Sequence, residues 1–129
     1  MRAFGWAIGA FMLITAQATA AGNRLDRSLQ MLAPEERLEQ LCDYTAMARI
    51  RKEIKDFKPD RALASATAEP RIRVDTIEVK GGAFRSRGKW YSLAYTCTAN
   101  PEHLKILTFH YAIGAEIPET KWAGYGLWN

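Results

Sequence analysis

The chain has 129 residues, of which 48% are hydrophobic and 25% are charged, a balance that is typical of a globular protein and excludes a disordered one. Its length has room for one domain. The formal charge of +4 falls well short of the basic composition of nucleic-acid-binding proteins, so nucleic acid is not an expected partner.

The N-terminal residues have the three parts of a secretory signal peptide. Arg2 supplies the positive start, residues 3–14 form an apolar run of 12, and Ala18-Thr19-Ala20 offers small residues for cleavage after Ala20. The alternatives are a membrane anchor or a buried helix. A spanning helix needs about 20 apolar residues, and polar residues end this run early.

We therefore expect residues 1–20 to be removed and residues 21–129 to form one exported domain, periplasmic or secreted. No later stretch is apolar for long enough to span a bilayer, so no transmembrane segment is expected after the leader is removed.

Export affects how the two cysteines, Cys42 and Cys97, are interpreted. In an oxidising compartment, thiols within reach of each other form a disulfide. The alternatives are two separate buried thiols, or a metal site, for which the cysteine spacing and the two histidines are unsuitable. We favour the disulfide, which would stabilise the fold by about 4 kcal/mol in the chain-entropy model.

The first part of the mature chain has helical periodicity. A short amphipathic helix is predicted from Asn23 to Leu32, and Ala33-Pro34-Glu35-Glu36 is typical of a helix start. Asp43 is predicted to cap a second helix, which would continue to Lys58. Residues 59–70 lie between two prolines, and we expect a connector there with one turn of helix.

From Arg71 the hydrophobic period changes to two, which indicates strands. Residues 71–76 are predicted to form one strand, Gly81-Gly82 a turn or bulge, and Gly88 the turn of a hairpin. A further strand is predicted from Leu104 to Ile113, after a turn at residues 100–102.

One face of residues 89–98 carries Tyr91, Leu93, Tyr95 and Cys97, and Cys42 lies on the apolar face of its helix. A helix packed across the sheet would bring both sulfurs into one layer. The predicted fold is α+β, with N-terminal helices on a three- to four-stranded antiparallel sheet.

Several runs of the mature chain resemble the domain of unknown function 930 family of exported proteins of Gram-negative bacteria. The runs are Leu32 to Asp43, Ala83 to Tyr91 with Cys97, His103 to Tyr111, and Ile117-Pro118 with Trp122, Tyr125 and Leu127. The resemblance implies an envelope protein and supports the pairing of Cys42 with Cys97. It implies no activity, cofactor, ligand or catalytic residue.

The most suggestive candidate site is a basic and aromatic hairpin without an acid between Gly81 and Asn100. Its candidate anion-binding residues are Lys80, Arg85, Arg87, Lys89 and Trp90. Arginine can bind phosphate or carboxylate through two hydrogen bonds, and a nearby ring can stack on a ligand. The alternative is a charged edge that only prevents strand-to-strand aggregation.

Catalysis is a weaker hypothesis. His103 is expected at the surface, whereas His110 is expected to be half-buried and would need a carboxylate such as Glu35, Glu36 or Asp43 to form a small hydrolase site. No nucleophile motif, metal site or cofactor motif is found in the sequence.

The chain ends in an aromatic stretch from Trp122 to Asn129, which we expect either to cover the fold or to dock on a partner. The leading hypothesis is a non-catalytic envelope module that binds an anionic component or another envelope protein. A purely structural envelope protein is the remaining alternative.

Overall fold

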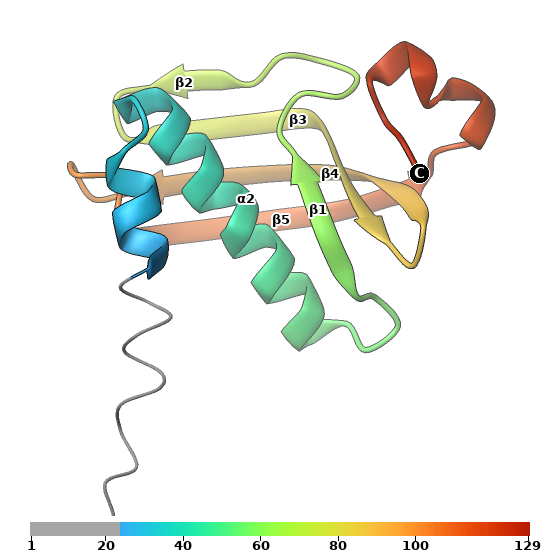
Figure 1. Cartoon of the computed structure of the whole chain (residues 1–129), viewed down its shortest axis with the longest axis horizontal. Helices are drawn as coiled ribbons and strands as arrows, with labels where there is room; N and C mark the ends of the chain where they lie inside the picture. Colours follow the sequence, from blue (N-terminus) through green and yellow to red (C-terminus); the bar gives the residue numbers. More distant parts are fainter. Residues whose placement is uncertain (1–23) are drawn as a thin grey trace, which may run out of the picture.

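A computed structural model describes residues 24–129 (Figure 1). A helical segment at residues 24–30 comes first. It is followed by α2 (Pro34–Glu53), β1 (Pro59–Leu63), β2 (Arg71–Arg73), β3 (Thr76–Ser86), β4 (Lys89–Ala99), β5 (Ile106–Glu116) and the 3-10 helices η1 (Glu119–Lys121) and η2 (Ala123–Tyr125). The α+β class is confirmed, and the described residues form five antiparallel strands, one more than the upper expectation. The predicted leader and its cleavage point lie outside the described residues.

Helix α2 begins where the sequence predicts. Pro34 occupies the start of the helix, where its missing N–H costs no hydrogen bond. Glu35 in the first turn and Arg51 in the last turn suit the positive and negative ends of the helix dipole. The local signals therefore determine this helix start.

The prediction that Asp43 begins a second helix is wrong. Asp43 lies inside α2, which continues without a break. Buried residues recur at Leu38, Cys42, Ala46 and Ile50, a spacing of four that keeps one face of a single helix on the core. The carboxylate of Asp43 accepts a hydrogen bond from another element and does not cap a helix.

The connector predicted at residues 59–70 is also partly wrong, because its first five residues form β1. Pro59 is the first residue of this edge strand, a position that tolerates a residue without an N–H. β1 pairs with β3 from Pro59 opposite Ser86 to Leu63 opposite Ala83. Pairing with a distant strand, which no local pattern encodes, decides this conformation.

Residues 71–76 form a hairpin and not the single predicted strand. β2 pairs with the start of β3, with Ile72 opposite Ile77, and the chain turns at Val74 and Asp75. Val74 has a φ of 52° and its side chain is 83% exposed at this turn. The alternation of side chains continues on both sides of the turn, which is why the sequence pattern does not reveal it.

The two glycine predictions are resolved as a bulge and a tight turn. The register of β3 against β4 shifts between Val79 and Gly82, so Lys80 and Gly81 form a bulge inside β3 and Gly82 resumes the pairing. Arg87 and Gly88 both have positive φ, 52° and 76°, as a two-residue hairpin turn of the tightest type requires.

β5 starts later than predicted. The side-chain oxygen of Asn100 accepts hydrogen bonds from the N–H groups of Leu104 and Lys105, at 2.9 and 3.0 Å, and holds them in a loop before Ile106. The strand then continues to Glu116, three residues beyond the predicted end.

Helix α2 lies across one face of the sheet (Figure 1). Cys42 of α2 and Cys97 of β4 form a disulfide there, with Cα atoms 6.1 Å apart, as predicted. The main core contains Leu38, Ile77 and Leu93, all at most 1% exposed. The helix and the sheet therefore share one buried layer, and the disulfide crosses it.

A smaller core lies around Trp90, whose position in β4 alternates with that of the main-core residues. Ile117, Trp122 and Leu127 from the C-terminal segment pack with Trp90 and Ala83. The C-terminal segment thus covers one end of the sheet, which is the first of the two alternatives that the sequence left open. Trp128 stays 43% exposed.

Candidate functional site

Arg85 of the predicted anion site is engaged within the protein. Its Nε and one terminal nitrogen donate 2.9 Å hydrogen bonds to the two carboxylate oxygens of Asp60 in β1. The Arg85 side chain is 13% exposed. Its guanidinium holds the pKa of Asp60 below the usual range, mainly through this hydrogen bonding. Arg85 therefore joins β1 to β3, and its fork is not open to a ligand.

Trp90 is not a surface ring as the anion-site prediction requires. It is fully buried, and its indole N–H donates a 2.7 Å hydrogen bond to the backbone oxygen of Trp128. The Arg85 guanidinium carbon lies 5.8 Å from the ring centroids of both Trp90 and Trp128. Trp90 thus supports Arg85 and the C-terminal segment, and it is unavailable to stack on a ligand.

The three lysine and arginine residues that remain from the prediction are separated. Lys80 lies in the bulge of β3, and its amino group is 3.4 Å from Glu78. Lys89 and Arg87 lie at the hairpin turn and are exposed, with Lys89 3.6 Å from Glu116. Only Arg87 and Lys89 therefore stay together on an accessible surface.

Other basic residues, which the sequence pattern does not connect with the hairpin, lie beside these two. The backbone N–H of Lys58 donates a 2.8 Å hydrogen bond to Oγ of Ser86, next to the turn. Arg51 at the end of α2 donates to the backbone oxygen of Pro59. Lys55 lies in the turn between Arg51 and Lys58. The name basic tip is used below for Arg51, Lys55, Lys58, Arg87 and Lys89.

The basic tip carries an excess of positive charge. Its five cations are exposed, and the carboxylates near them include Asp56 in the same loop and Glu116 beside Lys89, whereas Glu53 and Asp60 are paired with Arg49 and Arg85. Among residues 24–129, an ion pair is found for Lys89 and for none of the other four members. The charges of these four residues are therefore not neutralised by an ion pair within this part of the chain.

The C-terminus borders the basic tip (Figure 1). A Cβ atom built on Gly88 would lie 3.9 Å from Oδ1 of Asn129. The ring of Trp128 packs 5.4 Å from that of Trp90 and is still 43% exposed. An exposed indole thus lies next to the cluster of cations.

The prediction that His103 is a surface residue is wrong. It is 5% exposed, with Nδ1 2.7 Å from the backbone oxygen of Pro34 and Nε2 2.8 Å from Oδ1 of Asp75. His103 therefore joins the start of α2 to the turn between β2 and β3. Both contacts are structural.

His110 is exposed and not half-buried as expected. It pairs with Thr96 of β4, whereas the neighbouring Tyr95 points into the core and contacts Asp43. The sheet consequently separates His110 from α2 and its carboxylates, Glu35, Glu36 and Asp43. The structure does not bring together the groups that the hydrolase hypothesis needs.

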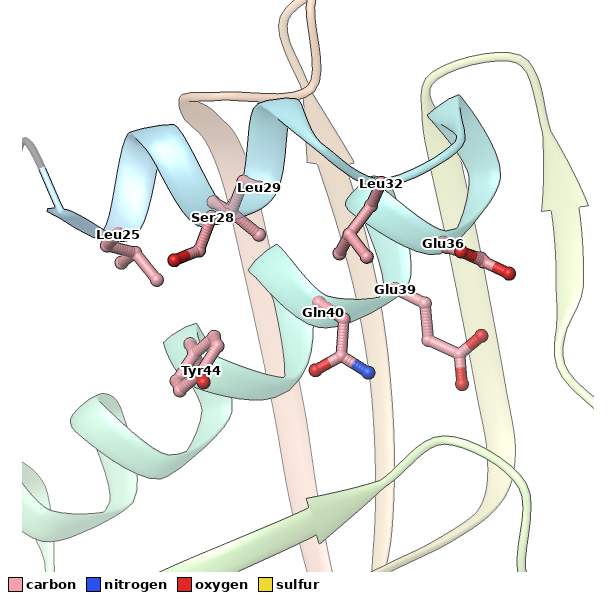
Figure 2. Close-up of a pocket in the computed structure, with 8 residues that line it drawn as sticks. All are labelled: Leu25, Ser28, Leu29, Leu32, Glu36, Glu39, Gln40 and Tyr44. Carbon is pink, nitrogen blue, oxygen red and sulfur yellow. The ribbon is translucent and has the colours of Figure 1, made fainter.

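A pocket of about 420 Å³ lies between the N-terminal helical segment and α2 (Figure 2). Leu25, Leu29 and Leu32 line one side, and Glu39 and other polar side chains of α2 line the other. Burial, followed by repulsion from Glu69 and Glu36, raises the pKa of Glu39. The pocket is partly apolar and bordered by carboxylates.

Asp43 is the residue that sequence reasoning interpreted most incompletely. It is 4% exposed, and its Oδ1 accepts a 2.8 Å hydrogen bond from the hydroxyl of Tyr95. Burial raises the pKa of Asp43 to about 7, the Tyr95 hydrogen bond opposes this, and Glu39 adds to it. The apolar period of four from Leu38 to Ile50 spans position 43, and this signal could have placed Asp43 inside one continuous helix.

Within residues 24–129, no group of three or more His, Cys, Asp or Glu side chains has the arrangement of a metal site. None of the helices in this part of the chain is long and apolar enough to cross a membrane.

Comparisons with known proteins address the family and not the activity. Residues 29–127 match the family described as Domain of Unknown Function (DUF930). Neither the curated proteins nor the solved structures gave a match. Since the family match covers most of the chain, this protein belongs to the DUF930 family.

Proposed function

We propose that this protein is an exported, non-catalytic binding module whose basic tip associates with anionic headgroups at a membrane surface of the bacterial envelope. The leader pattern of residues 1–20 supports export. The Cys42–Cys97 disulfide is consistent with an oxidising compartment, where such bonds persist.

The observation that carries the proposal is the grouping of the basic tip from three separate segments. The end of α2, the loop before β1 and the β3–β4 turn each contribute to it, with Arg87 and Lys58 close to the same residue, Ser86. Each lysine or arginine near an anionic bilayer contributes about 1 kcal/mol, and the contribution falls off within a Debye length.

The exposed ring of Trp128 favours a membrane surface over a purely polar anionic partner. Tryptophan is enriched at membrane interfaces, where its ring contacts apolar groups and its N–H faces polar ones. Trp128 borders the turn that holds Arg87 and Lys89, so cations and ring would meet the surface together.

The membrane part of the proposal is tested by sedimentation with vesicles. The purified protein should sediment with phosphatidylcholine vesicles that contain phosphatidylglycerol and not with phosphatidylcholine alone, and high salt should release it. Equal sedimentation with both kinds of vesicle, or none with either, contradicts membrane binding through the basic tip.

Export is tested separately, by N-terminal sequencing of the protein from a periplasmic extract of the native cells. The expected first residue is Ala21, directly after the predicted cleavage point. A chain that retains Met1 and is found only in the cytoplasm contradicts export and leaves the vesicle result unaffected.

A further inference from the structure

A second pocket, of about 360 Å³, lies between α2 and β1. α2 contributes Gln40, Asp43, Tyr44 and Met47 to its walls, and β1 contributes Asp60 and Arg61. It differs from the pocket of Figure 2 in one respect. The carboxylates of the Figure 2 pocket, Glu36 and Glu39, are exposed and half-buried, whereas Asp43 is 96% buried at the wall of this one.

The Asp43 carboxylate has one oxygen committed and one available. Oδ1 accepts the hydrogen bond from Tyr95, and no hydrogen bond to Oδ2 is found among residues 24–129. No side-chain oxygen or nitrogen in this part of the chain is both fully enclosed and unpartnered. Oδ2 is therefore not fully enclosed, and because Asp43 lines this pocket, we infer that Oδ2 can accept a hydrogen bond from a ligand there.

The electrostatics around this oxygen favour a cation. Glu39 lies one turn earlier on α2 and adds negative charge near Asp43. Asp60 also lines the pocket, but its carboxylate is paired with Arg85, and Arg61 is the one cation among the lining residues. Burial opposes the ionised form of Asp43, so its pKa is raised to about 7. A cation that entered the pocket would offset this cost by pairing with the carboxylate.

The number of accessible carboxylate oxygens favours an ammonium group over a metal ion. A single accessible carboxylate oxygen suits one N–H donor, whereas a metal ion needs several ligands that residues 24–129 do not group together. Tyr44 and Met47 also line the pocket, and an aromatic ring and a thioether chain are side chains that suit contact with an alkylammonium group.

We propose that this pocket binds a primary alkylammonium group, such as an amine ligand or a lysine-like side chain, through Oδ2 of Asp43. Its chemistry is opposite to that of the basic tip, so this proposal and the proposed function stand or fail separately. Because the ammonium pairs with ionised Asp43, binding strengthens as the pH rises through about 7. The other ionisable groups around the site are Tyr44 and Glu39 of α2, Asp60 and Arg61 of β1, Tyr95 of β4, and Arg85, which pairs with Asp60.

The first test is calorimetry of the purified protein with n-butylammonium chloride, at a pH above the pKa of Asp43. Asp43→Asn keeps an oxygen for Tyr95 and removes the charge, and it should weaken binding about tenfold or more. Glu36→Gln is the matched control, because it makes the same charge change outside this pocket, and it should bind as the native protein does. Equal binding by Asp43→Asn and the native protein, or none by the native protein, overturns the proposal.

A second measurement needs no variant and applies if Asp43→Asn does not fold. The pKa of the Asp43 carboxyl, followed by carbon NMR, should fall when n-butylammonium is added and stay constant when n-butanol is added. A pKa that does not respond to n-butylammonium overturns the proposal.

Discussion

Arg85 and Asp60 form an ion pair with two 2.9 Å hydrogen bonds, and this pair joins β1 to the β3–β4 hairpin. The guanidinium carbon of Arg85 also lies 5.8 Å from the ring centroids of both Trp90 and Trp128, whose rings pack against each other. Arg85, which the sequence pattern predicts as a ligand-binding residue, is thus held by a carboxylate 25 residues earlier in the chain. Its role is to position the edge strand and the C-terminal segment.

Arg85→Ala should therefore lower stability and leave vesicle binding almost unchanged. Loss of the two-bond pair and of the ring contacts is expected to cost on the order of 1 kcal/mol, measured by urea unfolding. Arg87→Ala, on the exposed turn two residues later, is the control. It should leave stability almost unchanged and weaken vesicle binding. If Arg85→Ala abolishes vesicle binding at unchanged stability, Arg85 is a ligand residue after all.

Removal of the disulfide should have a larger effect. The bond between Cys42 and Cys97 closes a loop over a separation of 55 residues, which stabilises the fold by about 4 kcal/mol in the chain-entropy model. The double variant Cys42→Ala/Cys97→Ala should show this loss in urea unfolding, and a reducing agent should destabilise the native protein but not the variant. A reducing agent without effect on the native protein would contradict this account.

Asp43 should make stability depend on pH. Its pKa is about 7 in the folded protein and near 3.8 when unfolded, so between these values the folded state binds the extra proton. The contribution of Asp43 to the free energy of unfolding is therefore greatest below pH 3.8. This contribution falls by at most about 1.4 kcal/mol per pH unit as the pH rises to about 7.

The comparison that isolates this effect is native protein against Asp43→Asn, unfolded in urea at several pH values. The difference in unfolding free energy should grow in favour of the variant between pH 3.8 and about 7 and then level off. A difference that is constant across this range would show that Asp43 has an ordinary pKa.

The two histidines should differ in their contribution to stability. His103→Ala leaves the backbone oxygen of Pro34 and the carboxylate of Asp75 without their partner, at an expected cost of about 1–3 kcal/mol. His110→Ala changes an exposed side chain and should alter thermal unfolding little. Equal melting temperatures for the two variants would contradict the structural role of His103.

Features with local signals could be predicted from the sequence. Pro34 and its two acids mark the start of α2, and Gly88 marks the hairpin turn. Alternation along β4 separates Cys97 from Thr96, and with the helical periodicity around Cys42 it places both sulfurs in one layer. These features are determined by residues that are close in the chain, so a single sequence is enough to predict them.

The rest depends on contacts between distant segments. β1 becomes a strand by pairing with β3, and with it comes Asp60, which removes Arg85 from the candidate site. The alternation in β4 shows that Trp90 and Cys97 face opposite sides, but both sides are buried because the C-terminal segment covers one of them. The partners of His103 lie 28 and 69 residues away, so its burial has no local signal.

The association of the basic tip with an anionic membrane surface is tested most directly by charge reversal. Arg87→Glu/Lys89→Glu reverses two charges of the tip, whereas Arg71→Glu/Arg73→Glu reverses two exposed charges on β2, at the other end of β3. The measurement is the partition of each variant onto phosphatidylglycerol-containing vesicles at low salt. The tip variant should bind about tenfold or more weakly while the β2 variant binds nearly as the native protein does. Equal losses in the two variants, or no loss in the tip variant, would contradict a binding site at the basic tip.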